Sequence, residues 1–83
     1  MKIVWDDPKR EANLIKHQMD FASPTEAFFE SSVVVPVREG RYAAVGHHLG
    51  DAILVVFAVL GTEALSVISM RPASRSERRL IDG

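Results

Sequence analysis

Cysteine is absent from this 83-residue chain, and aromatic residues make up only 7% of it. Without cysteine the chain forms neither a disulfide framework nor a thiolate metal site, which is typical of proteins in a reducing cytoplasm. A chain this short buries only about 60–65% of the surface that its unfolded form exposes. We therefore expect one domain over residues 1–83, with a thin margin of stability that a bound partner increases.

Long apolar runs are missing as well. The longest, residues 52–60, is far shorter than the roughly 20 residues that a membrane-spanning helix needs. The first residues become acidic at Asp6 and Asp7, so they lack the charged start, apolar stretch and cleavage site of a secretory signal. We expect no membrane segment and a cytoplasmic location.

A large excess of one charge sign is also missing, because the formal net charge is −1. Proteins that bind nucleic acid through its phosphates usually carry a positive charge. The positive residues are nevertheless concentrated near the C-terminus, where the four arginines between Arg71 and Arg79 outnumber Glu77 and Asp82. Any phosphate-binding surface should therefore include that end of the chain.

Three signals for the start of a helix stand in the sequence. Asp7 is an N-cap type of residue and Pro8 suits the first helical position, which predicts a helix from Pro8 to about His17. Residues 23–26 and 74–77 both have the Ser-x-x-Glu spacing of a capping box. They predict a short second helix and a short C-terminal helix.

Between the last two signals the chain is rich in β-branched residues, in segments separated by Gly-containing turns: 33–37, 41–48, 52–60 and 64–71. Turns this short join antiparallel neighbours, so a four-strand meander is predicted. Pro36 cannot donate to a ladder, which places its strand at an edge or at a bulge. Residues 3–5 form a small strand or an extended arm. The fold class is α+β, with the helices packed on one face of the sheet.

Arg71 is the first candidate for chemistry, because it is a permanent cation at the end of a strand of small and apolar residues. Its planar fork of donors suits a phosphate and the charge that develops on phosphorus during RNA cleavage. The alternative is a surface arginine paired with a nearby acid. Glu77 is either a proton acceptor or the capping-box residue, and we favour the cap.

Histidine is the side-chain type best suited to proton transfer near neutral pH, and the chain has three of them. His47 and His48 are adjacent on a strand and so point to opposite faces, and His17 has no second ligand at helical spacing. We therefore expect no metal site and no cofactor. Arg41 and His47 fall on one strand face, which suits phosphate binding together with acid–base chemistry but is also common by chance.

Other side chains have an ordinary explanation beside the functional one. Lys9 and Lys16 could reach phosphates from the first helix, although such lysines are more often solvated. The aromatic residues could stack on bases, yet packing is favoured for all of them: Trp5, Phe21, Phe28 and Phe29. Because no phosphate-binding glycine loop, nucleophile elbow or zinc spacing is present, the residues alone indicate only a small α+β domain.

Two signatures at opposite ends of the chain take the interpretation further. The first is Trp5-Asp6-x-x-Lys9-x-x-x-Asn13-x-x-Lys16-His17, followed by Phe21; the second is Ile68-Ser69-x-Arg71-x-Ala73-Ser74-x-x-Glu77-Arg78. Together with the strands between them, they resemble the BrnT family of type II toxins over almost the whole length of the chain.

The resemblance implies a RelE-like fold and a metal-independent endoribonuclease that blocks translation. It also implies neutralisation by a BrnA-like antitoxin with a ribbon-helix-helix domain, in a complex of higher order that touches operator DNA only through the antitoxin. RNA is the implied substrate, and no membrane is involved.

The same resemblance assigns roles to individual residues. Arg71 becomes the phosphate stabiliser, His17 and Lys16 take part in proton transfer or phosphate binding, and Arg41 is a second cation. Four further residues are expected to bind RNA: Lys9, Arg75, Arg78 and His47.

Three positions depart from the family pattern. Gln18 replaces a glycine after the Lys-His pair, His47 replaces an arginine, and Ile81 replaces a tyrosine. The last two changes leave open a second function, a weak or inactive toxin fold that binds the antitoxin and acts as a co-repressor. A plain interaction domain outside any toxin pair is the third possibility.

Overall fold

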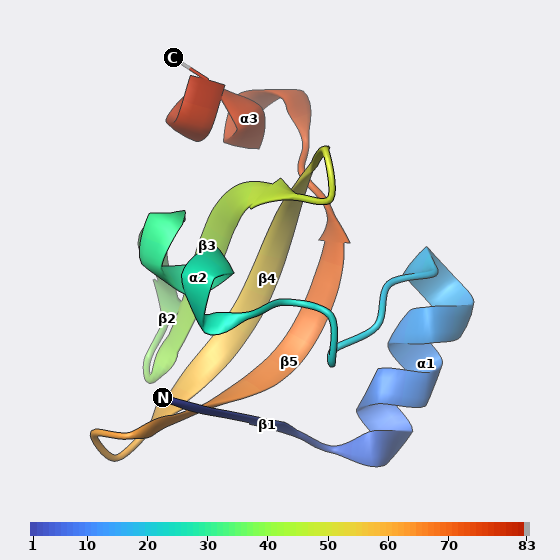
Figure 1. Ribbon diagram of the computed structural model, residues 1–83, viewed down its shortest axis with the longest axis vertical. Coiled ribbons are helices and arrows are strands. Elements are labelled where there is room, and N and C mark those ends of the chain that lie inside the picture. Colours follow the sequence, from blue (N-terminus) through green and yellow to red (C-terminus); the bar gives the residue numbers. More distant parts are fainter. Residues whose placement is uncertain (83) are drawn as a thin grey trace.

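The computed structural model describes residues 1–82 and has one sheet with helices at its edge and on both faces (Figure 1). The elements in chain order are β1 (Lys2–Trp5), α1 (Asp7–His17), α2 (Glu26–Ser31), β2 (Val33–Arg38), β3 (Arg41–His48), β4 (Asp51–Leu60), β5 (Ala64–Pro72) and α3 (Arg75–Asp82). Within the described part of the chain, no helix is long and apolar enough to cross a membrane.

The predicted α+β fold and the antiparallel meander of β2 to β5 are confirmed. The sheet has five strands rather than about four, in the order β1-β5-β4-β3-β2, because residues 2–5 pair parallel to β5. Ile3 and Trp5 pack against the main core from this edge strand. Pro36 lies in the opposite edge strand, and the register shifts between Pro36 and Arg38, so both features predicted from Pro36 are present.

The N-caps of the first two helices differ from the prediction by one or two residues. The Asp6 carboxylate accepts the Lys9 N–H at 3.2 Å, so Asp6 rather than Asp7 caps α1. Thr25 caps α2 by accepting the Phe28 N–H at 3.4 Å. The capping box predicted at Ser23 is therefore wrong, because α2 begins at Glu26 and only the residue before it can reach the free amides of the first turn.

At α3 the predicted capping box is confirmed. The Ser74 N–H donates to Glu77 Oε1 at 2.7 Å, and the Glu77 N–H donates to Ser74 Oγ at 3.3 Å. Each residue thus satisfies a backbone donor of the other, which fixes the point where the chain leaves β5 and turns into α3.

The two faces of the sheet are packed differently. One face carries the main core, in which Phe21, Phe28 and Phe29 cover side chains of β4 and β5 such as Val55 and Met70. This confirms the packing role of the aromatic residues.

The opposite face has a smaller cluster of Ala43, Val45 and Leu54 under α3, with Ile81 packed against it. Since α3 lies on this second face, the prediction that all helices share one face is wrong. Ile81 attaches α3 to the sheet through apolar contact.

Two residues, Asn13 and Gly46, set how closely α1 and α2 approach the sheet. Asn13, the one buried polar side chain among the described residues, accepts the Met70 N–H at 3.1 Å and donates to the Met19 carbonyl at 3.0 Å, which ties α1 to β5. Gly46 lies under α2, where a Cβ would stand 3.0 Å from the Phe28 ring. A larger residue there would push α2 off the sheet.

Candidate active site

Arg71 lies at the end of β5, opposite Leu54 in the ladder and hence on the same face as the smaller cluster. Its Nη1 and Nη2 donate to the two carboxylate oxygens of Glu77 at 2.8 Å each, and Nη1 also donates to the Pro72 carbonyl at 3.2 Å. The arginine side chain is 42% exposed. The expected alternative, pairing with a nearby acid, is thus realised, and it holds the guanidinium in one orientation.

Hydrogen bonds from Arg71, assisted by those from Ser74, lower the pKa of Glu77 from 4.5 to about 2. A carboxyl group with so low a pKa is fully ionised near neutral pH and is a poor proton acceptor there. Of the two roles considered for Glu77, the structure favours the cap, with the binding of Arg71 as an additional role.

The pairing with Glu77 leaves part of the guanidinium available. The bonds to Glu77 and to the Pro72 carbonyl use both hydrogens of Nη1 and one of Nη2, so the Nε–H and the second Nη2–H have no partner among the described residues. These two donors point in the same direction, because Nη2 is the nitrogen on the Nε–H side. Two parallel N–H groups match two oxygens of one phosphate.

Several residues of the first signature line a groove between α1 and β5. Lys9, Lys16 and His17 line it from the helix, and Ile68 and Ser69 line it from the strand. The spacing of seven residues between the lysines places both on the same side of α1.

This groove lies close to Arg71 along the strand. Ser69 and Arg71 face Val56 and Leu54 respectively in the ladder, so they share a face about 7 Å apart along β5. The structure therefore brings His17, Lys16 and Lys9 to the neighbourhood of Arg71, although the sequence separates them by more than fifty positions.

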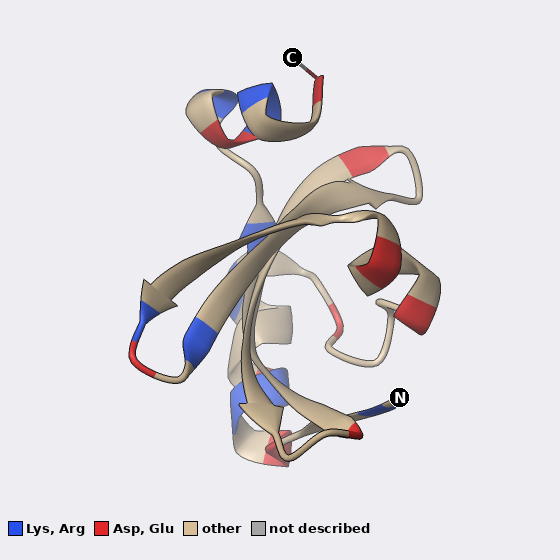
Figure 2. Cartoon of the chain, turned by 90° about the vertical axis from the view of Figure 1, so that its left-hand side faces the viewer, with Lys and Arg blue, Asp and Glu red and all other residues tan. Residues whose placement is uncertain are grey.

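The remaining predicted residues lie farther away on the same face. From the ladder positions, Arg41 lies about 16 Å and His47 about 12 Å from Arg71 between Cα atoms. His47 Nε2 is 2.9 Å from Asp82 of α3, and Arg75 and Arg78 are exposed on that helix. Figure 2 shows lysine and arginine positions on α3, on β5 and on the strand ends at the β2–β3 turn. A single phosphate cannot touch Arg41 and Arg71 together, but an RNA strand could span them.

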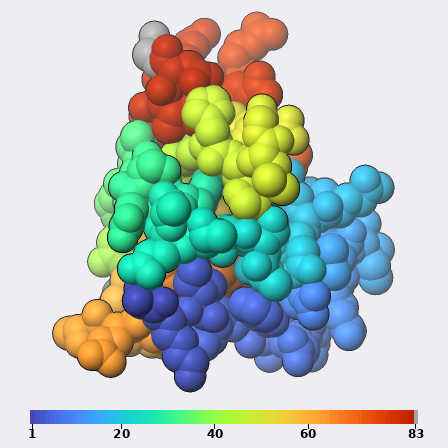
Figure 3. Space-filling view, viewed as in Figure 1, coloured from blue at the N-terminus to red at the C-terminus, as the bar shows by residue number. Residues whose placement is uncertain are grey.

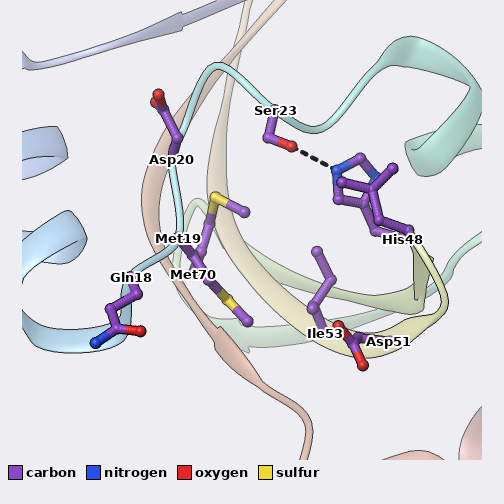
Figure 4. Close-up of a pocket in the computed structure, with 9 residues that line it drawn as sticks. Gln18, Met19, Asp20, Ser23, His48, Asp51, Ile53 and Met70 are labelled. Carbon is purple, nitrogen blue, oxygen red and sulfur yellow. Dashed lines mark hydrogen bonds between the residues drawn. The ribbon is translucent and has the colours of Figure 1, made fainter.

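His48 points to the other face, as predicted from its adjacency to His47. It is hydrogen-bonded to the Ser23 hydroxyl at 2.6 Å, in a cleft also lined by Met19, Ile53 and Met70 (Figure 4). The serine left unused by the α2 cap thus fixes the imidazole, and His48 is separated by the sheet from Arg71.

A second arginine–carboxylate pair was not foreseen from the sequence. Arg10 donates from Nε and Nη2 to Asp20 at 2.7 and 2.8 Å, which lowers the pKa of Asp20 from 3.8 to about 2. Arg10 also lies 6.0 Å above the Trp5 ring. The pair closes the loop after α1, and no local pattern links residues ten positions apart across a helix end.

The fold and the site define a small α+β domain with an oriented, partly exposed arginine and a groove lined by Lys9, Lys16 and His17 beside its first helix. Residues 5–77 match the model of a family described as the ribonuclease toxin BrnT of type II toxin–antitoxin systems. The crystal structure of the Brucella abortus ribonuclease toxin BrnT is 50% identical, with a TM-score of 0.85, over 90% of this chain and 99% of that one. A comparison with curated protein sequences gave no match. This chain belongs to the BrnT family of ribonuclease toxins.

Proposed function

We propose that this chain is a metal-independent endoribonuclease that cleaves RNA and thereby inhibits translation. The observation that carries the proposal is the free donor fork of Arg71 beside the groove of Lys9, Lys16 and His17. A fixed cation beside a groove that holds an imidazole and two ammonium groups offers the groups that such a reaction needs.

In this mechanism the ribose 2′-oxygen attacks the adjacent phosphorus and the bond from phosphorus to the 5′-oxygen breaks. His17 or Lys16 accepts the 2′-hydroxyl proton, and the other donates a proton to the departing 5′-oxygen. Arg71 holds two non-bridging oxygens through Nε and Nη2 while charge builds up on them. The products are a 2′,3′-cyclic phosphate and a 5′-hydroxyl, and each proton-transfer group contributes about 10²–10⁴-fold.

The more distant cations bind the RNA on either side of the cleaved phosphate. Arg41 and His47 continue the face along β3, and Arg75 and Arg78 continue it along α3. The role of Lys9 is to attract a phosphate at the entrance of the groove, since its position is exposed.

The proposed partner is a BrnA-like antitoxin of the ribbon-helix-helix kind, which neutralises the chain in the cytoplasm. Membership of a type II toxin–antitoxin family supports a protein antitoxin. The complex would contain more than one copy of each chain, and operator DNA would contact the antitoxin alone.

The test is induced expression of the intact chain and of Arg71→Ala without antitoxin, with growth and total RNA followed together. The matched control is Arg10→Ala, which removes the other arginine of a two-bond carboxylate pair. We expect the intact chain and Arg10→Ala to arrest growth and fragment RNA, and a soluble Arg71→Ala to do neither. A folded intact chain that causes neither effect would instead favour a binding module that acts as co-repressor.

A further inference from the structure

An apolar groove lies on the main-core face, below α2 and beside the free edge of the sheet. Its floor is formed by Phe29, Phe57 and Leu65, and its sides by Val34 and Val59. The floor residues are almost fully buried, whereas Val34 is 47% and Val59 52% exposed. Figure 3 shows this face, with α2 above the first residues of the chain and the β4–β5 turn at the lower left. Exposed apolar surface that is continuous with a buried floor is typical of a site for a partner protein.

Apart from the amino group of Met1, which also lines it, the charged groups around this groove are acidic. Glu30 lines it, α2 carries Glu26 and Glu30 without any lysine or arginine, and Glu63 stands in the adjoining turn. Glu26 is 3.5 Å from the amino group of Met1, while Glu30 and Glu63 have no ion pair among the described residues. Figure 2 shows α2 with acidic positions only. The groove therefore suits apolar side chains that are flanked by lysine or arginine.

We infer that this groove is the docking site of the antitoxin, through a segment of alternating apolar and basic residues. The inference rests on the proposed function for the existence of that partner. A second copy of this chain fits less well, because its own basic and apolar segment, α3, lies on the other face. Such a contact would be head-to-tail, joining two different surfaces, and would give a ring or an open filament rather than a simple two-fold dimer.

The position of the groove has a consequence for neutralisation. Since the groove and Arg71 lie on opposite faces of the sheet, a segment bound in the groove leaves the guanidinium uncovered. The segment supplies affinity, and a separate part of the antitoxin must reach the active face. Variants of the groove should therefore remain toxic but escape neutralisation.

The test measures binding of the purified chain to the antitoxin of its own pair by titration calorimetry. Val59→Asp should weaken binding by about tenfold or more, because it places a charge on an apolar wall of the groove. Ile15→Asp is the matched control, since Ile15 is an apolar residue 84% exposed on α1, and it should bind like the intact chain. In cells, the antitoxin should rescue growth from Ile15→Asp and fail to rescue it from Val59→Asp.

A second variant covers the case in which Val59→Asp fails to fold. Glu30→Lys reverses a charge at an exposed helix position, and it should weaken binding by about threefold to tenfold at low salt and less at high salt. Unchanged affinity in Glu30→Lys and in a folded Val59→Asp would overturn the inference. So would self-association of the intact chain that Val59→Asp abolishes. Binding is measured without RNA, so a chain that binds through the groove but does not cut RNA refutes only the proposed function.

Discussion

The two faces of the sheet are built from the same alternating strands, but they differ in how they are packed and in which polar side chains they expose. On one face, aromatic side chains from α2 and the preceding loop fill the space over β4 and β5, and His48 is hydrogen-bonded to Ser23. On the other face, α3 covers one end and leaves Arg71 with two unused donors beside the groove of α1. If the proposed site is correct, the residues that stabilise the fold and those that perform the chemistry are separated by the thickness of a single sheet.

This separation predicts that equivalent substitutions on the two faces have different effects. Removing His17 should lower the rate of RNA cleavage by about 10²–10⁴-fold, as expected for a proton-transfer group. His48→Ala, on the other face, should lower the melting temperature and leave the rate per folded molecule unchanged. Cleavage of a defined RNA by the two purified variants checks this, and equal loss in both would contradict the division of roles.

Substitution of Gly46 tests how tightly the main-core face is packed. A Cβ there would stand 3.0 Å from the Phe28 ring and 3.3 Å from the Ser32 side chain, so Gly46→Ala should destabilise the fold by about 1–3 kcal/mol. Urea unfolding measures this. The matched control is Gly40→Ala in the β2–β3 turn, where open space surrounds the position but φ is +72°, so its cost should come from the backbone alone and stay near 1 kcal/mol.

The two arginine–carboxylate pairs among the described residues make stability depend on pH in the same direction. The pKa values of Asp20 and Glu77 are about 2 in the folded chain, below their ordinary values of 3.8 and 4.5. Their contribution is therefore fully present above pH 4.5 and is lost as the pH falls towards 2.

Melting temperatures between pH 5 and pH 2 test this dependence. Glu77→Gln and Asp20→Asn should each reduce the slope of melting temperature against pH, by a modest amount because both pairs are partly exposed. If neither variant changed the slope, other carboxylates would control the acid transition.

Substitution of Gln18 should have the smallest effect, and that effect is on stability. It ends α1 in the left-handed region, with φ 57° and its N–H donating to the Leu14 carbonyl at 2.9 Å, although glycine adopts this conformation at lower cost. Gln18→Gly should therefore stabilise the fold by about 1 kcal/mol, which thermal unfolding would show. Destabilisation would mean that the Gln18 side chain makes a compensating contact in solution.

The sequence predicted those parts of the fold that depend on local signals. The strands, the α3 capping box and the edge position of Pro36 follow from residue types within a few positions of each other. The cap at Ser23 was misassigned because Thr25, two residues later, is an equally good N-cap residue. The parallel pairing of β1 and the position of α3 on the second face depend on long-range packing, which no local pattern records.

The candidate site was predicted as a set of residues but not as an arrangement. Arg71, His17 and Lys16 were named from chemistry and family resemblance, while the groove depends on Asn13 holding α1 against β5. A buried asparagine with a partner on a distant strand cannot be told from an exposed one in the sequence. Glu77 was correctly assigned as a cap. Its two hydrogen bonds with Arg71 depend on the turn at Pro72, whose geometry the sequence does not specify.

The most direct test of the central claim compares RNA cleavage rates of three purified chains: the intact protein, Arg71→Ala and Arg10→Ala. Both variants lose an arginine that makes two hydrogen bonds to a carboxylate, but only Arg71 lies on the proposed active face. The account predicts a loss of about 10²-fold or more for Arg71→Ala and a rate close to that of the intact chain for Arg10→Ala. Equal rates for Arg71→Ala and the intact chain, with both folded, would contradict it.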